Sequence, residues 1–189
     1  NALSELYANH NFKGLVFDLR GNEGGYFKEA VKIANIFLNK GELLVSVRGK
    51  DKDTSRYAED DVIYPSTPLI LLTDNYTVSS GEILTGAIQD NDRAVIIGQK
   101  GLVQQVYDMP QGTQLKLTTS YYYTPSGRCI QAFEYSDGNQ MQINNSLKKV
   151  FKTKNGREVF SSGGITPDII TEYHEPPAMI QSLLNDLVI

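Results

Sequence analysis

The sequence predicts an α/β domain with a largely parallel sheet. Three short apolar runs, GLVFDL, PLILLTD and AVIIG, stand at intervals along the chain. Continuous apolar runs of this length are typical of strands buried on both faces of a parallel sheet. Helical patterns and loops separate the runs, and this alternation of strand, loop, helix and strand is the order in which α/β folds are built.

The first part of the chain alternates helices and strands. We expect a helix over residues 2–9, a buried strand over residues 14–19 and then the glycine-rich loop RGNEGG. Apolar residues at helical spacing predict a helix over residues 27–39, which ends before Gly41 as a C-terminal cap. LLVSVRG predicts the next strand. A charged, tyrosine-containing loop over residues 50–62 then leads into the strand PLILLTD.

The second part begins with a further helix and strand and becomes more irregular. SSGEILTGAIQD predicts a helix opened by serine, and AVIIG predicts the strand after it. QLKLTTSYYYT alternates as a strand does and is closed by a turn at Pro125 and Gly127. Residues 134–163 are polar and predict a hairpin or a loop excursion. PAMIQSLLNDLVI predicts a closing amphipathic helix.

Composition excludes several classes of function. A chain of 189 residues, 40% of them apolar, fits one globular domain. A net charge of −4 and a pI near 5.2 argue against a nucleic-acid or anionic-lipid partner. One cysteine, Cys129, excludes an internal disulfide framework, and the chain is too poor in histidine for a structural zinc cluster. The chain has neither an initiator methionine nor a signal peptide at its start, so we expect a fragment of a longer protein.

The two histidines also bear on catalysis, because a Ser-His-Asp triad would need one of them. His10 lies at the end of the first predicted helix, and His174 lies in the polar stretch EYHEPP. Both positions favour surface histidines. A hydrolase with this sequence would therefore need a different base.

The segment TVSSGE, residues 77–82, could carry chemistry because a buried strand passes into a helix there. A serine at a helix N-terminus can use backbone amides and the helix dipole to stabilise an oxyanion. The spacing Ser79-x-x-Glu82 is also that of a capping box, in which both residues satisfy backbone amides. This motif alone favours the capping role.

Two other strand ends carry candidate groups. The glycines of DLRGNEGG could bring backbone amides close to a ligand, or could form an ordinary tight turn. In IIGQKGLVQ, Lys100 follows a strand and lies between glycines. A lysine acts as a general base only when it is neutral, which burial promotes, although a lysine in such a loop is usually solvated.

Together and in this order, these segments resemble the C-terminal processing peptidases, also called tail-specific proteases, which are serine peptidases of the Ser/Lys type. The resemblance runs from GLVFDLRGNEGG through PLILLTDNYTVSSGEILTGAIQDNDRAVIIG and KGLVQQVYDMPQGTQLKLTTSYYYTPSGRCIQ to GGITPDI. It implies the crotonase-like (ClpP/crotonase-type) α/β spiral with additional β-strands. It also implies a serine endopeptidase that cleaves unstructured or C-terminal segments of proteins without a metal or cofactor.

The resemblance further implies roles for individual residues. The family's nucleophile is the serine of the S-x-x-E element, here Ser79, and its base is the lysine of a G-K-G element, here Lys100. A glutamine four residues after the lysine orients it, which is Gln104 in this chain. The oxyanion donors would be the amide of Ser80 and an amide of the glycine-rich loop, with Gly24 preferred over Gly25.

Two departures from the family pattern leave alternatives open. Family members carry a longer run before the base, whereas this chain passes from Gly98 through Gln99 and Lys100 to Gly101. In one explanation, residues are missing from the sequence at this point, and Lys100 is then either the base or merely the residue after the strand. In the other, the loop is truly short, and the protein is a catalytically dead, peptide-binding relative. The family also carries a PDZ domain before this core, so we expect one outside residues 1–189, which form a single catalytic core.

The remaining expectations concern Asp90, Cys129 and the setting of the protein. Asp90 matches a further acidic position of the family, with a supporting role, and Cys129 is interpreted as a small packed residue. The resemblance implies polypeptide substrates bound in extended form beside a sheet edge, a location in the cell envelope or periplasm, and leaves a homo-oligomer open. A crotonase-class acyl-CoA enzyme is a further alternative, against which the sequence shows no acidic pair placed for proton transfer.

Overall fold

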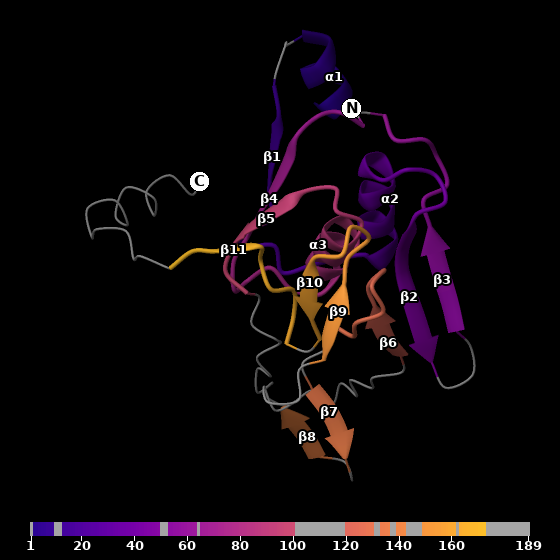
Figure 1. Ribbon diagram of the computed structural model, residues 1–189, viewed down its shortest axis with the longest axis vertical. Coiled ribbons are helices and arrows are strands. Elements are labelled where there is room, and N and C mark those ends of the chain that lie inside the picture. The colour runs from indigo at the N-terminus through magenta and orange to yellow at the C-terminus, as the bar shows by residue number, and fades with distance from the viewer. Residues whose placement is uncertain are drawn as a thin grey trace, which may run out of the picture.

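Helices α2 (Phe27–Phe37) and α3 (Ser80–Asp90) lie between a parallel sheet and an antiparallel sheet in the computed structural model (Figure 1). The structure describes residues 2–9, 13–49, 53–63, 65–100, 120–130, 133–136, 139–142, 149–161 and 163–172. The predicted α/β class is therefore confirmed, together with its parallel sheet.

The parallel sheet has the strand order β1-β4-β5-β11. Its strands are β1 (Leu15–Asp18), β4 (Leu69–Thr73), β5 (Val95–Gly98) and β11 (Ile169–Ile170). The helices are α1 (Ala2–Asn9), α2 (Phe27–Phe37) and α3 (Ser80–Asp90). In the register of the sheet, Leu71 pairs with Phe17 on one side and with Ile96 on the other. Because these strands are parallel, their carboxyl ends lie at the same edge of the sheet, and the loops after β1, β4 and β5 begin there.

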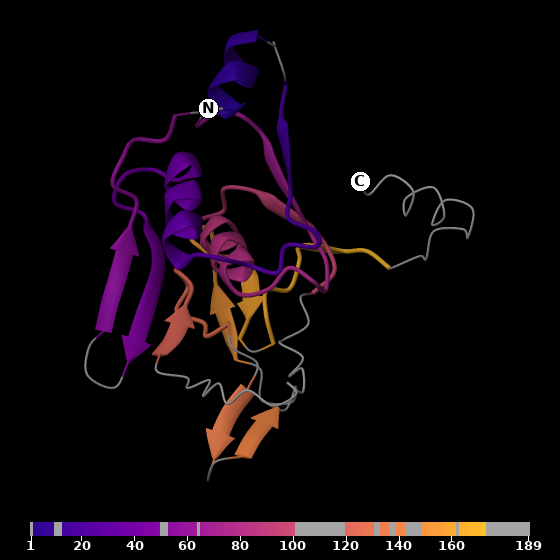
Figure 2. The ribbon, with the colours of Figure 1, turned by 180° about the vertical axis from the view of Figure 1, so that it is seen from behind.

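The second sheet is antiparallel and has the order β3-β2-β6 (Figure 2). Its strands are β2 (Leu43–Gly49), β3 (Asp53–Tyr57) and β6 (Ser120–Tyr123), and two hairpins follow, β7 (Phe133–Ser136) with β8 (Asn139–Gln142) and β9 (Val150–Lys152) with β10 (Glu158–Phe160). Of the hairpin or loop excursion expected over residues 134–163, the hairpin is thus confirmed, and the described residues of this segment form two. The turn at Pro125 and Gly127 is also confirmed, since the amide of Gly127 donates to the carbonyl of Thr124 at 2.8 Å.

Strand β3 corrects the loop predicted over residues 50–62. Four of its five residues are exposed, so it forms a polar edge strand. It pairs with β2, where the hydroxyls of Ser46 and Ser55 lie 2.9 Å apart. A second correction is small: α2 ends at Phe37 rather than at residue 39. The closing helix and residues 114–119 (QLKLTT) fall outside the described residues.

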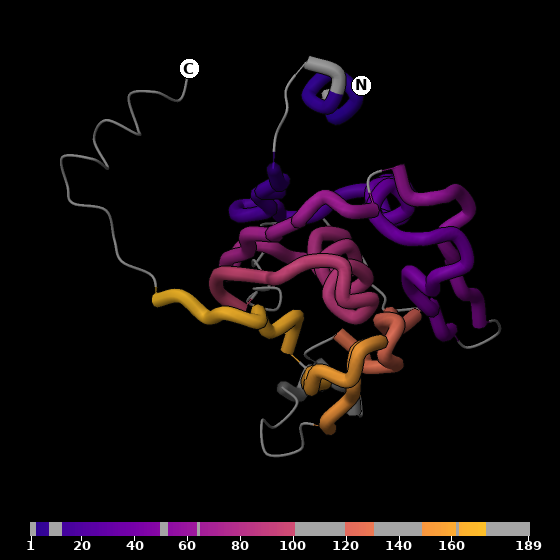
Figure 3. Tube along the Cα trace, turned by 45° about the horizontal axis from the view of Figure 1, so that its top comes forward, coloured from indigo at the N-terminus to yellow at the C-terminus, as the bar shows by residue number. Residues whose placement is uncertain are grey.

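The hydrophobic core lies between the parallel sheet and the helices. Leu71 and Ile96 are completely buried on this face, and every residue of α3 is buried. On the opposite face, Val16 and Val95 are 59% and 41% exposed in the described part of the chain. The prediction that these strands are covered on both faces is therefore wrong within that part. Strand β11 forms the edge of the sheet on the side away from β2 and β3 (Figure 3).

Candidate active site

Ser79 occupies the turn between β4 and α3 in a strained backbone conformation. Its φ and ψ are +56° and −119°, a combination that costs a non-glycine residue about 1–3 kcal/mol. The side chain is exposed and makes no capping hydrogen bond to α3. The capping-box interpretation of this serine is therefore wrong, because a capping residue needs an extended backbone.

Gly24 of the glycine-rich loop lies directly against this serine. A Cβ on Gly24 would be 2.7 Å from the Cβ of Ser79 and 3.2 Å from its Oγ, and the φ of Gly24 is +96°. The position therefore requires glycine both for its conformation and for the close approach. The amide of Gly24 donates to Oδ1 of Asn22 at 2.8 Å, so it is already engaged within its own loop.

Hydrogen bonds join the glycine-rich loop to the turn that carries Ser79. The hydroxyl of Thr77 donates to the carbonyl of Leu19 at 2.8 Å. The amide of Val78 donates to the carbonyl of Asn22 at 3.0 Å. Two of the segments predicted from sequence are thus held together at one edge of the parallel sheet.

Helix α3 begins at Ser80, immediately after the strained serine. The first amides of an α-helix have no partner within the helix, and the helix dipole adds positive potential there. The amide of Ser80 stands at this end. It follows Ser79 directly in the chain.

Lys100 follows β5 and is half-buried. The strand ends at Gly98, where the chain passes so close to β4 that a Cβ would lie 1.9 Å from the carbonyl oxygen of Thr73. Beyond it, the Lys100 amine lies beside Gly163, since a Cβ on that glycine would be 2.7 Å from Nζ. Lys100 also acts electrostatically on Glu82, in the first turn of the helix that begins after Ser79.

Glu82 is a residue of this site for which the sequence predicts only a capping role. Its side chain is buried, and burial raises its pKa to about 7 against the opposing effects of the Ile165 amide and Lys100. The signal available in the sequence was a glutamate inside the otherwise apolar stretch GEILTGAI. A group whose pKa is moved by burial and by one charged neighbour is a candidate for a functional role.

Asp90 lies at the other end of α3, in a buried ion pair. Its carboxylate is 2.7 Å from the guanidinium of Arg128, and its second oxygen accepts the amide of Ser126 at 3.0 Å. Helix α3 has eleven residues and is roughly 16 Å long. Asp90 is therefore separated from Ser79 by the length of the helix and anchors the far end of it.

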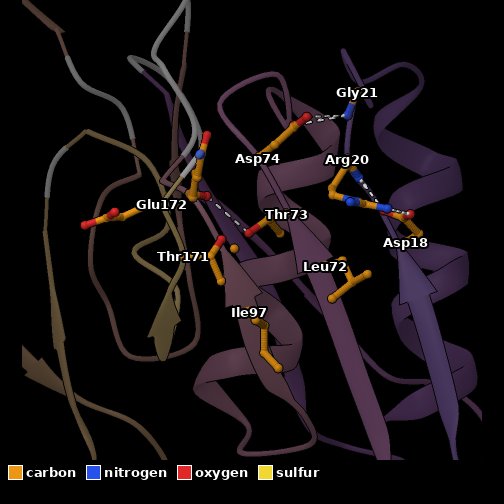
Figure 4. Close-up of a pocket in the computed structure, with 11 residues that line it drawn as sticks. Asp18, Arg20, Gly21, Leu72, Thr73, Asp74, Ile97, Thr171 and Glu172 are labelled. Carbon is orange, nitrogen blue, oxygen red and sulfur yellow. Dashed lines mark hydrogen bonds and ion pairs between the residues drawn. The ribbon is translucent and has the colours of Figure 1, made fainter. Parts of the chain in front are cut away.

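An open cleft of about 740 Å³ lies at the carboxyl ends of β1, β4 and β5 (Figure 4). Leu72 and Ile97 project into it, and the ion pair between Asp18 and Arg20, at 2.7 Å, lines one side. Ligands of open α/β sheets bind at this edge. Its lining includes Asp74, at the start of the turn that carries Ser79, but the serine itself lies beyond the cleft.

The other residues singled out from sequence contribute less. Gln104, His10 and His174 lie outside the described residues. Cys129 is half-buried, and its backbone forms an isolated β-bridge with Tyr123 at the end of β6. Within the described ranges, acidic, histidine and cysteine side chains form no group of three or more that could hold a metal ion. The helices of that same part are too short or too polar to cross a membrane.

An exposed serine on a strained strand-to-helix turn, backed by a glycine-rich loop, defines an α/β protein with a candidate serine nucleophile. The sequence profile of peptidase family S41 matches residues 1–138, and the chain belongs to this family. The resemblance drawn from the motifs is thereby confirmed.

Individual relatives agree with this assignment. The chain is 44% identical over 125 residues to the carboxy-terminal-processing protease of Bartonella bacilliformis, covering 63% of this chain and 29% of that protein. It is 34% identical over 130 residues to the chloroplastic C-terminal processing peptidase of Tetradesmus obliquus, covering 67% and 28%. The chain therefore spans less than a third of these curated relatives.

A solved structure shares the fold. The photosystem II D1 C-terminal processing protease superposes with a TM-score of 0.62 at 25% identity, over 97% of this chain and 41% of that one. The mixed α/β fold expected from the resemblance is thus that of S41 peptidases.

Proposed function

We propose that this chain is the catalytic core of a serine endopeptidase in which Ser79 is the nucleophile and Lys100 the base. The observation that carries the proposal is the strained, exposed conformation of Ser79, with Gly24 pressed against it. Strain of this kind is retained where the surrounding structure holds it for a function. The family of the chain and the names of its relatives support the same reaction.

The reaction is hydrolysis of an amide through an acyl-enzyme. Oγ of Ser79 attacks the carbonyl carbon while its proton passes to the neutral amine of Lys100. The tetrahedral intermediate then breaks its C–N bond, and the lysine returns the proton to the leaving amine. Water then attacks the ester of the acyl-enzyme in the same way, with Lys100 taking the proton of the water and returning it to Oγ of Ser79 as the ester bond breaks. All of these steps use groups of the chain and water.

The oxyanion of the intermediate would accept the amides of Ser80 and Gly24. Because the Gly24 amide now donates to Asn22, the substrate oxygen would replace Oδ1 of Asn22 as its acceptor. Gln104 would orient Lys100, and Asp90 would support the site by fixing the far end of α3.

The substrates would be unstructured or C-terminal segments of polypeptides, bound in extended form. The open cleft at the carboxyl ends of β1, β4 and β5 supports this, since it adjoins the turn that carries Ser79. We place the protein in the cell envelope or periplasm, with a PDZ domain outside this chain. Its relatives with processing-protease names are bacterial and chloroplastic.

A fluorophosphonate probe tests the assignment. We expect the full chain to be labelled at Ser79 and to degrade an unstructured polypeptide, and both activities to be lost in Ser79→Ala and Lys100→Ala. Ser46→Ala is the matched control, because Ser46 pairs with Ser55 in the antiparallel sheet. Equal labelling of wild type and Ser79→Ala would refute the nucleophile.

The short connection from Gly98 to Lys100 gives the test a second outcome. A chain that binds unstructured polypeptide but is never labelled would be a peptide-binding pseudoprotease. Tandem mass spectrometry of residues 97–107 would show whether further residues, with a Gly-Lys-Gly run, stand in this loop.

A further inference from the structure

Glu82 is a buried acid beside the proposed base, and the mechanism above does not use it. It lies three residues after Ser79 in the first turn of α3, and the residue is 8% exposed. Among the described residues, its Oε1 has no hydrogen-bond partner. A buried carboxyl oxygen without a partner is rare in a folded protein and asks for an explanation.

The segment from Gly163 to Ile165 brings this carboxyl and the Lys100 amine together. The amide of Ile165 donates to the Glu82 carboxyl, and Lys100 is the charged group that acts on it. Two residues earlier, Gly163 leaves room for the amine, since a Cβ there would be 2.7 Å from Nζ and 3.3 Å from Cε. The Glu82 carboxyl is thus bonded to this short stretch of backbone, and the Lys100 amine lies against the same stretch.

That stretch is itself fixed on both sides. The amide of Gly164 donates to the carbonyl of Ile130 at 3.1 Å. Nε2 of Gln89 donates to the carbonyl of Thr166 at 2.9 Å. These two hydrogen bonds fix the position of the backbone around Gly163, and so the space beside it that the Lys100 amine occupies.

We propose that Glu82 is a positioning residue for Lys100, which holds the lysine amine near the start of α3 and sets, through its own charge, the pH at which that amine can act as a base. This inference rests on the proposed Ser79 and Lys100 mechanism. A carboxylate close to an ammonium favours the charged form, whereas a neutral carboxylic acid does not. With burial raising the pKa of Glu82 to about 7, this charge changes in the neutral pH range.

Glu82→Gln separates charge from shape. The amide side chain keeps the size of glutamate and an acceptor for Ile165, but it carries no negative charge. We expect the acid limb of the pH profile of kcat/KM to move to lower pH by about one unit or more, because the ammonium loses its counter-charge. A purely structural role for Glu82 would lower the rate without moving the limb.

Glu42→Gln is the matched control. The Glu42 carboxylate pairs with Lys154 at 2.5 Å instead of with Lys100, so its removal should leave the acid limb in place. An unmoved limb in folded Glu82→Gln overturns the inference. If Lys100→Ala keeps full activity, the proposed base has failed; if it is inactive while the Glu82→Gln limb is unmoved, only this inference fails.

Gly163→Ala provides a second variant in case Glu82→Gln does not fold. Its methyl group would lie 2.7 Å from Nζ of Lys100, so the flexible end of the lysine must move away, and Glu82 is left intact. We expect kcat to fall at least tenfold with KM little changed, since the substrate cleft is not touched. A folded Gly163→Ala chain with full kcat and an unmoved acid limb would show that the rate does not depend on where the amine lies, and would contradict a positioning role for Glu82.

Discussion

The guanidinium of Arg128 donates to the carboxylate of Asp90 at 2.7 Å, and both side chains are almost completely buried, at 1% and 0% exposure. The pair joins the C-terminal end of α3 to the turn after β6, since Asp90 also accepts the amide of Ser126. A buried charge that loses its partner is expensive, because neither water nor another group replaces it. The pair therefore fixes the far end of the helix that begins after Ser79.

Asp90→Asn should destabilise the fold strongly. The substitution keeps the size of the side chain but leaves the Arg128 cation without a counter-charge, so we expect a loss of about 3–5 kcal/mol in the free energy of unfolding. Urea denaturation of the full chain measures it. Lys32→Ala is the control, because it breaks an exposed pair with Glu29 that contributes only about 0.2–0.5 kcal/mol. Equal losses in the two variants would refute the role of the buried pair.

Gly24→Ala should displace the nucleophile without unfolding the chain. The added methyl group would lie 2.7 Å from the Cβ of Ser79 and 3.0 Å from the carbonyl of Val78. Because a displacement of about 1 Å can lower a rate by about 100-fold, we expect a loss of this order in the rate of labelling by a fluorophosphonate. Gly25→Ala should lose far less, since nothing lies within 4 Å of its Cβ position. Similar rates in both variants would contradict the contact.

The parallel core could be predicted because its signal is local. Strands β1, β4 and β5 coincide with the three apolar runs, and α3 coincides with its helical pattern. The site at their carboxyl ends followed from the topology, since parallel strands bring their loops to one edge. The contact between Gly24 and Ser79 joins two of the segments singled out from sequence.

The rest depended on information that a single sequence does not carry. Strand β3 is polar because it is an exposed edge strand, so its residues resemble those of a loop. The spacing of Ser79 and Glu82 fits both a capping box and a nucleophile turn, and only the positive φ of Ser79 distinguishes them. The pairing of Asp90 with Arg128 joins residues 38 positions apart, which no local pattern could indicate.

Gly98→Ala should prevent proper folding. Its Cβ would lie 1.9 Å from the carbonyl oxygen of Thr73, which belongs to the backbone of β4 and cannot move aside, and its φ is +138°. We expect a loss of at least about 4 kcal/mol, at the extreme of single substitutions. Gly156→Ala isolates the backbone strain, because that glycine has a φ of +89° with nothing near its Cβ position; it should lose about 1–2 kcal/mol. Thermal melts compare the two, and equal losses would exclude the clash as the cause.

The burial of Glu82 should make the stability of the chain depend on pH. Burial raises its pKa from 4.5 to about 7, so the folded chain binds this proton more tightly than the unfolded chain does. The resulting stabilisation is complete below pH 4.5 and is lost as the pH rises through about 7. Since one pKa unit corresponds to about 1.4 kcal/mol, the change is on the order of 3 kcal/mol.

Glu82→Gln should remove this dependence, because glutamine does not titrate. Urea denaturation at about pH 5 and about pH 8 measures the free energy of unfolding of both chains. Between these two pH values we expect the wild type to lose on the order of 3 kcal/mol more than the variant. Glu42→Gln provides a control of opposite sign. Burial opposes ionisation of Glu42, but hydrogen bonds from Lys154 and Asn39 hold its pKa below the usual value, so its stabilisation is already present at about pH 5 and does not fade at higher pH. A constant difference between wild type and Glu82→Gln would show that Glu82 ionises in the folded chain as easily as in the unfolded one.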